Sequence, residues 1–280
     1  MKKRLTKPTT VALQGAYACH GYRRAADRPV RAAAGPAVPV PSCAAWAAQA
    51  LGFAADPVQA AVLNGHHRRL LLLTCRQWGK SVVAAVRALW QALFFPGSLI
   101  VVVGPVENQA TELNHKIYGF VARLGLAVHG GGHGALRLCF PNGSRIVGLS
   151  EVPDHVRGLS APALILVDEA AFFRGDEILE ALMPMLATRP DGAVWLMSTP
   201  KGQSGFFYDL WHATAGPWHR VRVTAAEIPG RIAADFLAEQ AQRNPEKYRR
   251  EYCCEFLAAD GALFSREALA ALLTDEVEPL

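Results

Sequence analysis

A succession of short strand-like runs, most of them apolar throughout, limits the folds open to this chain more than any other feature. Helix-like stretches separate these runs from one another. A strand is apolar along its whole length when both faces of its sheet are covered, which is typical of a parallel sheet with helices on either side. The pattern therefore predicts an α/β fold with strands at 70–74, 99–103, 164–167, 194–198 and 219–223, and helices at 80–94, 108–124, 176–187 and 205–213.

The regions that flank this alternation differ from it in composition. Residues 1–44 are rich in Ala, Pro and Arg and lack hydrophobic periodicity, which favours an extended chain. Two short helices follow in the prediction, one from about residue 44 and one that starts at Pro57 and stops at Gly65. Residues 231–256 read as helical with no strand between them. We therefore expect a basic extension at 1–44, a core at 45–228, and a small helical lid with a truncated linker at 229–280.

A hairpin is expected inside the core. Residues 136–150 carry Asn142-Gly143 between two apolar runs, and this dipeptide suits the tight turn of a β-hairpin.

Composition excludes several classes of protein. A chain of 280 residues that is 51% hydrophobic can bury a full core, and no apolar run approaches the ~20 residues that a membrane helix needs. No apolar stretch follows the basic N-terminus, so we expect no secretory signal and no membrane partner. The six cysteines form no CxxC pair, which favours reduced thiols in a cytoplasmic protein.

The net charge of +5 is unevenly distributed. Residues 1–50 hold eight Lys and Arg side chains against Asp27 alone, so the rest of the chain is slightly acidic. A basic tail of this kind either contacts nucleic acid or is simply solvated.

The stretch LLLTCRQWGKS at 71–81 runs a predicted strand into a predicted helix through Gly79, Lys80 and Ser81. A tight turn of backbone N–H groups at a helix N-terminus can cradle phosphates, a lysine can reach the outer phosphates, and a hydroxyl can ligate Mg²⁺. The three residues fit these tasks in their order. The sequence therefore predicts a site for ATP and Mg²⁺.

A second apolar strand delivers two carboxylates. ALILVDEAAFF at 163–173 carries Asp168 and Glu169 at the end of its apolar run, and ligands of open α/β sheets bind at the carboxyl ends of strands. Asp168 would hold Mg²⁺ directly or through water, and Glu169 would polarise the attacking water. We expect the two strands to be neighbours and Lys80 to lie close to the acidic pair.

Two residues of the first loop depart from the common phosphate-binding pattern, because Thr74 occupies the place of the usual first glycine and Arg76 lies within the loop. With these departures, CRQWGKS resembles the phosphate loop of the large subunit of tailed-phage terminases, the ATP-driven motors that package DNA into procapsids. The resemblance implies a RecA-like P-loop NTPase fold. It also implies a nucleotide contact along the whole loop, which comprises Thr74, Cys75, Arg76, Gln77, Trp78, Gly79, Lys80 and Ser81.

Other segments resemble the same family in the same order. Pro57-Val58-Gln59 resembles its adenine-recognising motif, with Gln59 as the adenine contact; the alternative is a surface glutamine after a helix-capping proline. LMSTPKG at 196–202 resembles its coupling motif, in which Ser198 or Thr199 would report loss of the γ-phosphate; the alternative is a polar strand-end turn. VVVGPVENQA at 101–110 and the stretch at 247–264 also resemble the family's segments at those places.

An arginine that offsets charge in the transition state has two candidates. VRGLS at 156–160 resembles the family's Arg-Gly segment, so Arg157 competes with Arg76 for this role. For either residue the alternative is a salt bridge that tethers its own loop.

The resemblance spans about residues 46–265. It implies a motor that translocates double-stranded DNA as a homo-oligomeric ring, with a portal protein and a small terminase subunit as partners, in the host cytoplasm at the procapsid. DNA contacts stay unassigned, with Arg137, Arg145 and the N-terminal cations as candidates. Family members usually continue into a ribonuclease H-like nuclease, for which residues after 265 leave no room, so we expect no nuclease activity from this chain.

Three other functions are compatible with parts of the sequence. A superfamily-2 helicase shares the Gln motif, Gly-Lys-Ser and Asp-Glu but needs a second RecA-like domain. An esterase is suggested by HGGGHG at 129–134, but Phe206 replaces the last glycine of GxSxG, and His129 and His133 have no nearby Cys or carboxylate to complete a metal site. A catalytically idle packaging adaptor is disfavoured because Lys80 and Glu169 are both present.

Overall fold

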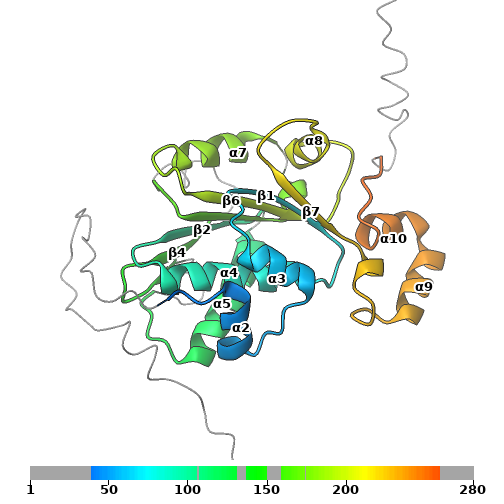
Figure 1. Cartoon of the computed structure of the whole chain (residues 1–280). Helices are drawn as coiled ribbons and strands as arrows, with labels where there is room; N and C mark the ends of the chain where they lie inside the picture. Colours follow the sequence, from blue (N-terminus) through cyan, green and yellow to red (C-terminus); the bar gives the residue numbers. More distant parts are fainter. Residues whose placement is uncertain (1–38, 106, 131–136, 150–158, 174, 259–280) are drawn as a thin grey trace, which may run out of the picture.

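The computed structural model describes residues 39–105, 107–130, 137–149, 159–173 and 175–258 of the chain. Its centre is a seven-stranded sheet with the strand order β3-β4-β2-β5-β6-β1-β7 (Figure 1). The strands are β1 (Arg69–Thr74), β2 (Leu99–Val103), β3 (Arg137–Cys139), β4 (Arg145–Leu149), β5 (Leu164–Asp168), β6 (Ala193–Ser198) and β7 (His219–Val223). Every neighbouring pair is parallel except β3 and β4, which form an antiparallel hairpin.

Helices cover both faces of this sheet. One face carries α2 (Cys43–Leu51), α3 (Pro57–Asn64), α4 (Lys80–Phe94) and α5 (Glu107–Leu124), and the other carries α7 (Glu177–Leu182) and α8 (Phe206–His212) (Figure 1). The 3-10 turns are η2 (Ala170–Phe172), η3 (Met183–Leu186) and η4 (Ala225–Glu227). Two more helices, α9 (Ala234–Arg243) and α10 (Pro245–Glu251), lie beside the sheet beyond β7. The predicted α/β fold with a mainly parallel sheet is confirmed.

The core explains why the strands are apolar throughout. β2 and β5 are buried at every residue, and β1 at every residue after Arg69. Leu70, Leu71, Leu72 and Leu73 have no exposed surface. Burial of a leucine side chain contributes about 1.5–3 kcal/mol relative to leaving it in water. These central strands therefore hold the loops at their carboxyl ends on a rigid base.

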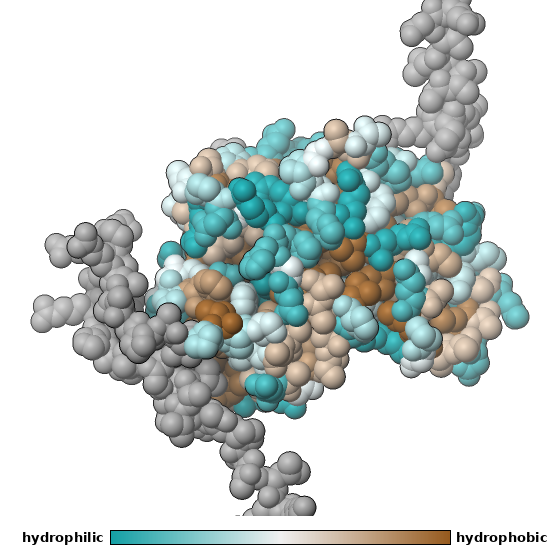
Figure 2. Space-filling view, viewed as in Figure 1, coloured by the Kyte–Doolittle hydropathy of each residue, from teal (hydrophilic) through white to brown (hydrophobic). Residues whose placement is uncertain are grey.

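The α9–α10 pair is attached to the core through a few apolar residues. Ile232, Leu237 and Tyr248 are half-buried and pack against the core, whereas Phe236 stays 41% exposed. On the face in Figure 2, hydrophobic residues gather between the core and this pair, and polar residues cover most of the rest. Neither helix has a fully buried residue.

Most of the predicted elements are found, and the helix from Lys80 to Phe94 has its predicted bounds. The predicted hairpin is confirmed, with Gly143 at φ 82 in its turn. The predicted helix at 176–187 is confirmed only in its first half: α7 ends at Leu182, and a 3-10 turn follows. Pro184 explains the break, because proline has no N–H to donate to the preceding turn of an α-helix.

The predicted helical stretch at 231–256 is also interrupted. Asn244 lies between α9 and α10 with φ −152, and its side chain accepts a hydrogen bond from the N–H of Lys247 to cap α10. Pro245 then occupies the first turn, where the absence of an N–H costs nothing. Residues after Glu251 leave the helix and return to the segment that follows β7, where the Ala225 N–H in η4 donates to the Tyr252 carbonyl.

The division at 1–44, 45–228 and 229–280 stays a prediction. The first described helix begins at Cys43, capped by the Ser42 hydroxyl, which accepts a hydrogen bond from the Ala45 N–H. In the part of the chain that the structure describes, no helix is long and apolar enough to cross a membrane.

Candidate functional site

The loop between β1 and α4 makes its turn at residues other than the first glycine position. Thr74 ends β1 in a fully buried position, and the left-handed conformations fall on Gln77 with φ 67 and Gly79 with φ 100. Glycine adopts such a φ without strain, whereas Gln77 does so at a cost that the surrounding structure must offset. The fully buried Trp78 side chain lies between these two residues and anchors the loop to the core.

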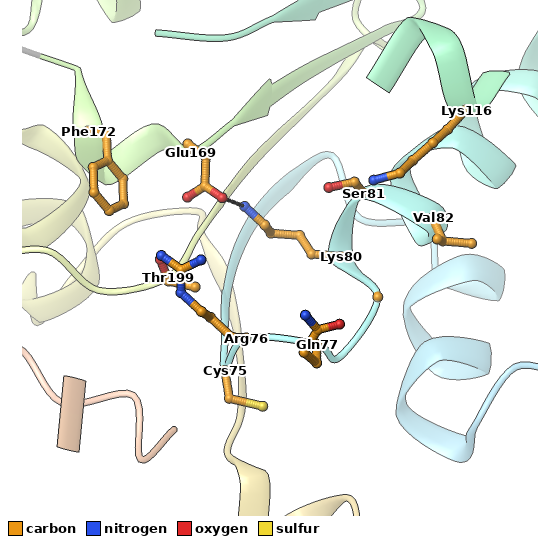
Figure 3. A pocket seen from close by; sticks show the side chains of 11 residues that line it. Cys75, Arg76, Gln77, Lys80, Ser81, Val82, Lys116, Glu169, Phe172 and Thr199 are labelled. Carbon is orange, nitrogen blue, oxygen red and sulfur yellow. Dashed lines mark ion pairs between the residues drawn. The ribbon is translucent and has the colours of Figure 1, made fainter. Parts of the chain in front are cut away.

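Lys80 begins α4 directly after this loop. Its ammonium lies 2.7 Å from Asp168 Oδ1. It also lies 2.7 Å from Glu169 Oε1 (Figure 3). Burial lowers the pKa of Lys80, but the attraction of the two carboxylates outweighs it, so the pKa lies above its ordinary value. The expected closeness of Lys80 to the acidic pair is therefore found.

The acidic pair lies at the end of β5, on the opposite side of β6 from β1. The strands β1 and β5 each pair with β6, so the expectation that they are neighbours is wrong. The insertion of β6 has a consequence for the site, because it brings the end of β6 between the carboxyl ends of β1 and β5. Ser198 closes that strand, and Thr199 follows it.

The end of β6 supports Glu169. The Ser198 hydroxyl donates to Glu169 Oε2 at 3.4 Å and accepts from the Ala171 N–H at 3.2 Å. Glu169 itself has φ 51 and ψ 44, a left-handed conformation that is uncommon for a residue with a side chain. Its N–H donates to Asp168 Oδ1 at 3.0 Å. The turn after β5 is therefore shaped to present the Glu169 carboxylate toward Lys80.

A cavity of about 510 Å³ opens above these strand ends. Such a volume lies within the range of about 300–1,000 Å³ that small-molecule sites occupy. The residues that line it are Cys75, Arg76, Gln77, Gly79, Lys80, Ser81, Val82, Lys116, Glu169, Phe172 and Thr199 (Figure 3).

Several predicted site residues do not line this cavity. Thr74, Trp78 and Ser198 are fully buried beneath it. Gln59 also has no exposed surface: its Oε1 accepts from the Asp56 N–H and its Nε2 donates to the Trp78 carbonyl. The Gln59 amide thus contacts the backbone of the loop and does not line the cavity. The adenine contact of Gln59 stays a prediction.

The two candidate arginines have different outcomes. Arg76 lines the cavity, and its Nε lies 3.0 Å from Glu251 Oε2 at the end of α10. Its side chain is 57% exposed, and its backbone N–H donates to the Glu251 carbonyl. Arg157 lies outside the described residues.

Four side chains near the site were not predicted as site residues. Lys116 from α5 points toward Ser81 in Figure 3, and Phe172 lies beside Glu169 with the Lys201 ammonium 5.5 Å from its ring centroid. Glu251 and Arg231 come from the C-terminal helical region and contact the loop of residues 75–79 between β1 and α4, which we call the phosphate-type loop. Phe172 and Glu251 lie in stretches that were singled out for other reasons, and Lys116 and Arg231 lie outside every motif, so only their place in the fold identifies the four as site residues.

Oxygen ligands for a metal ion are present at one point of the site. The Ser81 hydroxyl donates to Asp168 Oδ2 at 3.3 Å. Among the residues that the structure describes, no group of three or more His, Cys, Asp or Glu could hold a metal ion by itself. Mg²⁺ prefers oxygen ligands and is commonly held by one or two carboxylates together with phosphates and water. The pair of Ser81 and Asp168 fits that mode of binding.

A parallel sheet with a lysine-bearing loop at one strand end and an acidic pair two strands away defines a RecA-like P-loop α/β domain. A family model described as the N-terminal part of the T4likevirus-type terminase large subunit matches residues 71–271. The chain therefore belongs to the terminase large subunit family.

Individual relatives agree with this assignment. The terminase large subunit of Thermus virus P23-45 is 28% identical over 265 residues, which cover 81% of this chain and 53% of the relative. The ATPase domain of the Thermus phage P74-26 large terminase matches with a TM-score of 0.64 and 26% identity, covering 75% of this chain and 97% of that one. The chain spans about half the length of the curated relatives it matches.

A more distant structure shares the fold. The large terminase of a thermophilic bacteriophage, solved in complex with ADP, matches with a TM-score of 0.56 at 13% identity, and covers 72% of this chain and 52% of that one.

Proposed function

We propose that this chain is the ATP-hydrolysing domain of a DNA-packaging motor that moves double-stranded DNA into a phage procapsid. The observation that carries the proposal is the convergence of Lys80, Asp168 and Glu169 beneath one cavity, in a chain of the terminase large subunit family. The ADP bound by the large terminase of the thermophilic bacteriophage supports nucleotide as the ligand of this domain.

Phosphate binding is assigned to the loop before α4. Four residues of this loop line the cavity together with Lys80, the first residue of the helix: Cys75, Arg76, Gln77 and Gly79. N–H groups at a helix N-terminus attract anions, and a lysine adds a full positive charge. The triphosphate would compete with the two carboxylates for Lys80, so nucleotide binding frees Glu169 for its own role.

Ser81 and Asp168 would hold Mg²⁺. When bound, this ion neutralises charge on the β- and γ-phosphate oxygens. Their hydrogen bond at 3.3 Å shows that the two oxygen atoms already lie side by side.

Hydrolysis is assigned to Glu169, which would orient and polarise the attacking water. The carboxylate is 25% exposed and lines the cavity, so water can reach it. Phosphoryl transfer depends mostly on positioning and charge stabilisation. Arg76 or Arg157 would offset the charge that develops in the transition state, and Ser198 or Thr199 would pass on the loss of the γ-phosphate.

The remaining parts of the proposal follow from the family. They are a homo-oligomeric ring, contacts with duplex DNA, a portal protein and a small terminase subunit, and action in the host cytoplasm at the procapsid. A separate helicase and an idle packaging adaptor are the alternatives that an assay must exclude.

Phosphate release from Mg-ATP by the full chain tests the proposal, with mant-ATP fluorescence as a separate measure of binding. Lys80→Ala should weaken binding about a hundredfold, because a charge-assisted contact with phosphate is lost. Lys247→Ala on α10 should match the wild type, because that residue is exposed and does not line the cavity. Binding without turnover would favour the idle adaptor, and neither binding nor turnover would refute the nucleotide site.

Translocation has a test of its own. Duplex DNA should stimulate turnover at low salt, and the stimulation should fall as salt rises because phosphate contacts release counterions. No stimulation by any duplex in an assembled complex would contradict the DNA motor while leaving the ATPase intact.

A further inference from the structure

The carbonyl of Trp78, in the middle of the phosphate-type loop, accepts hydrogen bonds from two side chains that approach from different elements. Gln59 Nε2, on α3, donates at 2.7 Å, and Arg231 Nη1, three residues before α9, donates at 2.5 Å. The second nitrogen of the guanidinium, Nη2, lies 3.1 Å from Asp56 Oδ2. The carbonyl is therefore held by one neutral and one positively charged donor.

The partners of Trp78 are themselves fixed in place. Asp56 is the N-cap of α3, and its other oxygen, Oδ1, accepts from the Gln59 N–H at 2.8 Å. The Gln59 Oε1 accepts from the Asp56 N–H, which completes a capping box. Arg231 therefore joins a closed network of hydrogen bonds, and the orientation of its planar guanidinium is set at both ends.

This network controls a group that faces the cavity. All described peptide bonds are trans, so the carbonyl of Trp78 and the N–H of Gly79 point in opposite directions from the same rigid unit. Holding that carbonyl at the back of the loop directs the Gly79 N–H forward, and Gly79 lines the cavity. The positive charge on Arg231 also polarises this peptide, which strengthens its N–H as a donor.

The peptide needs such support because the residues on both sides of Trp78 are left-handed. Gln77 has φ 67 and Gly79 has φ 100, and glycine at 79 has several accessible conformations. A Cβ at residue 79 would lie 3.2 Å from Gln59 Nε2 and 3.5 Å from Arg231 Nη1, so the two side chains lie directly against the loop. Without them, nothing else among the described contacts holds the Trp78 carbonyl.

We infer that Arg231 is a positioning residue for nucleotide binding: it locks the Trp78–Gly79 peptide in the orientation that presents the Gly79 N–H to a phosphate group. The inference rests on the proposed nucleotide function of this cavity. It also makes the segment before α9 part of the phosphate-binding unit. A change in the position of α9 would therefore move Arg231 and change the orientation of the Trp78–Gly79 peptide.

A comparison of three variants of the full chain tests this role. Arg231→Met keeps the length of the side chain and removes its charge and donors, whereas Arg231→Lys keeps the charge and loses the planar pair of donors. Arg243→Met is the matched control, since Arg243 is an exposed arginine at the end of α9. Binding of mant-ADP and mant-ATP is measured by fluorescence titration with Mg²⁺, and turnover is measured over a range of ATP concentrations.

We expect Arg231→Met to raise the dissociation constant and the KM about tenfold, as for loss of one charge-assisted hydrogen bond, while kcat changes less than about threefold. Arg231→Lys should recover part of the affinity, and Arg243→Met should bind as the wild type does. A purely structural role would lower the melting temperature of the nucleotide-free protein without this split between KM and kcat. Amide hydrogen exchange of the loop should be faster in Arg231→Met than in the control.

The outcomes separate this inference from the proposed function. Nucleotide binding by Arg231→Met within about twofold of the wild type overturns the inference and leaves the proposed function standing. A wild-type protein that binds no nucleotide refutes the proposed function itself. If Arg231→Met does not fold, Arg231→Lys and Asp56→Asn decide, because each breaks part of the network and must weaken binding more than about twofold.

Discussion

The Lys80 ammonium lies 2.7 Å from Oε1 of Glu169, so the lysine assigned to phosphate binding is paired with the carboxylate assigned to hydrolysis. A phosphate group that draws Lys80 away would leave Glu169 with the Ser198 hydroxyl as its remaining side-chain contact among those described. On the proposed function, the pair would thus couple occupation of the cavity to the state of Glu169.

Glu169→Gln should abolish most hydrolysis while nucleotide still binds. Removing the charge takes away both the group that polarises water and a competitor of phosphate for Lys80, so we expect kcat to fall at least about a hundredfold and the affinity for mant-ATP to stay equal or rise. Phosphate release and fluorescence titration measure the two effects. Equal losses of binding and turnover would mean that Glu169 acts on the fold of the site rather than on water.

Ser198 and Thr199 should differ in their effects, because only Thr199 lines the cavity. Ser198→Ala removes the hydroxyl beside Glu169 and leaves the Ala171 N–H without its acceptor, so we expect kcat to fall about tenfold with little change in affinity. Thr199→Val keeps the shape of the side chain and should weaken nucleotide binding by about three- to tenfold. Steady-state kinetics of the two variants provide the test, and identical kinetic profiles would contradict this division of roles.

Arg76 can act on the nucleotide or tether its loop to Glu251, and paired variants distinguish the two. If Arg76 offsets transition-state charge, Arg76→Ala should lower kcat at least about a hundredfold, whereas Glu251→Gln should keep it within about threefold. The Arg76 side chain of this ion pair is 57% exposed, so solvent screens the pair and limits its contribution to about 1 kcal/mol; thermal stability should change little in either variant. Similar kinetic losses in both variants would favour the tether.

The free energy of unfolding should decrease as the pH rises through the ordinary pKa of a cysteine thiol. Burial raises the pKa of Cys75 from 9.0 to about 11 and that of Cys43 from 9.0 to about 12. Since both thiols are neutral in the folded state, the stability they confer is fully present below pH 9 and is lost as the unfolded thiols ionise above it. Between pH 8 and pH 10 each should remove about 1 kcal/mol from the free energy of unfolding.

Urea denaturation at several pH values measures this slope. The Cys43→Ala/Cys75→Ala variant is the comparison, and its stability should depend less on pH than that of the wild type. The remaining slope includes Cys254, whose pKa is also raised by burial. An unchanged slope in the double variant would show that these two thiols do not determine the alkaline loss of stability.

The sequence predicted most of the fold because its local signals are strong. The leucines of β1, the glycine and lysine that open α4, and Asn142-Gly143 in the hairpin each constrain the backbone within a few residues. The predicted helix at 176–187 is too long, because the prediction followed the helical pattern past Pro184. Proline has no N–H to donate within an α-helix, so the α-helix ends before it. The interruption at Asn244 also falls beside a proline, but its cause is an Asn-Pro step in which Asn244 caps α10 and Pro245 begins it.

The candidate site was predicted where its residues lie at or shortly after the end of a strand. Lys80 and Ser81 begin α4 after the loop that follows β1, Asp168 ends β5, and Glu169 follows it; parallel strands bring their carboxyl ends to one edge of the sheet. The order of the strands is not a local property, so the place of β6 between β1 and β5 could not be read from their patterns.

By itself, then, the amino-acid sequence determined the element types, the phosphate-type loop and the acidic pair, because turn chemistry and hydrophobic period act between near neighbours. The tertiary structure alone decided which distant side chains support the site. Arg231 is separated by 153 positions from Trp78, and Ser198 by 29 from Glu169, yet each pair is in hydrogen-bond contact. Such contacts arise from the packing of the whole core, which sets the loops against one another once β6, β7 and the helices beyond them are in place.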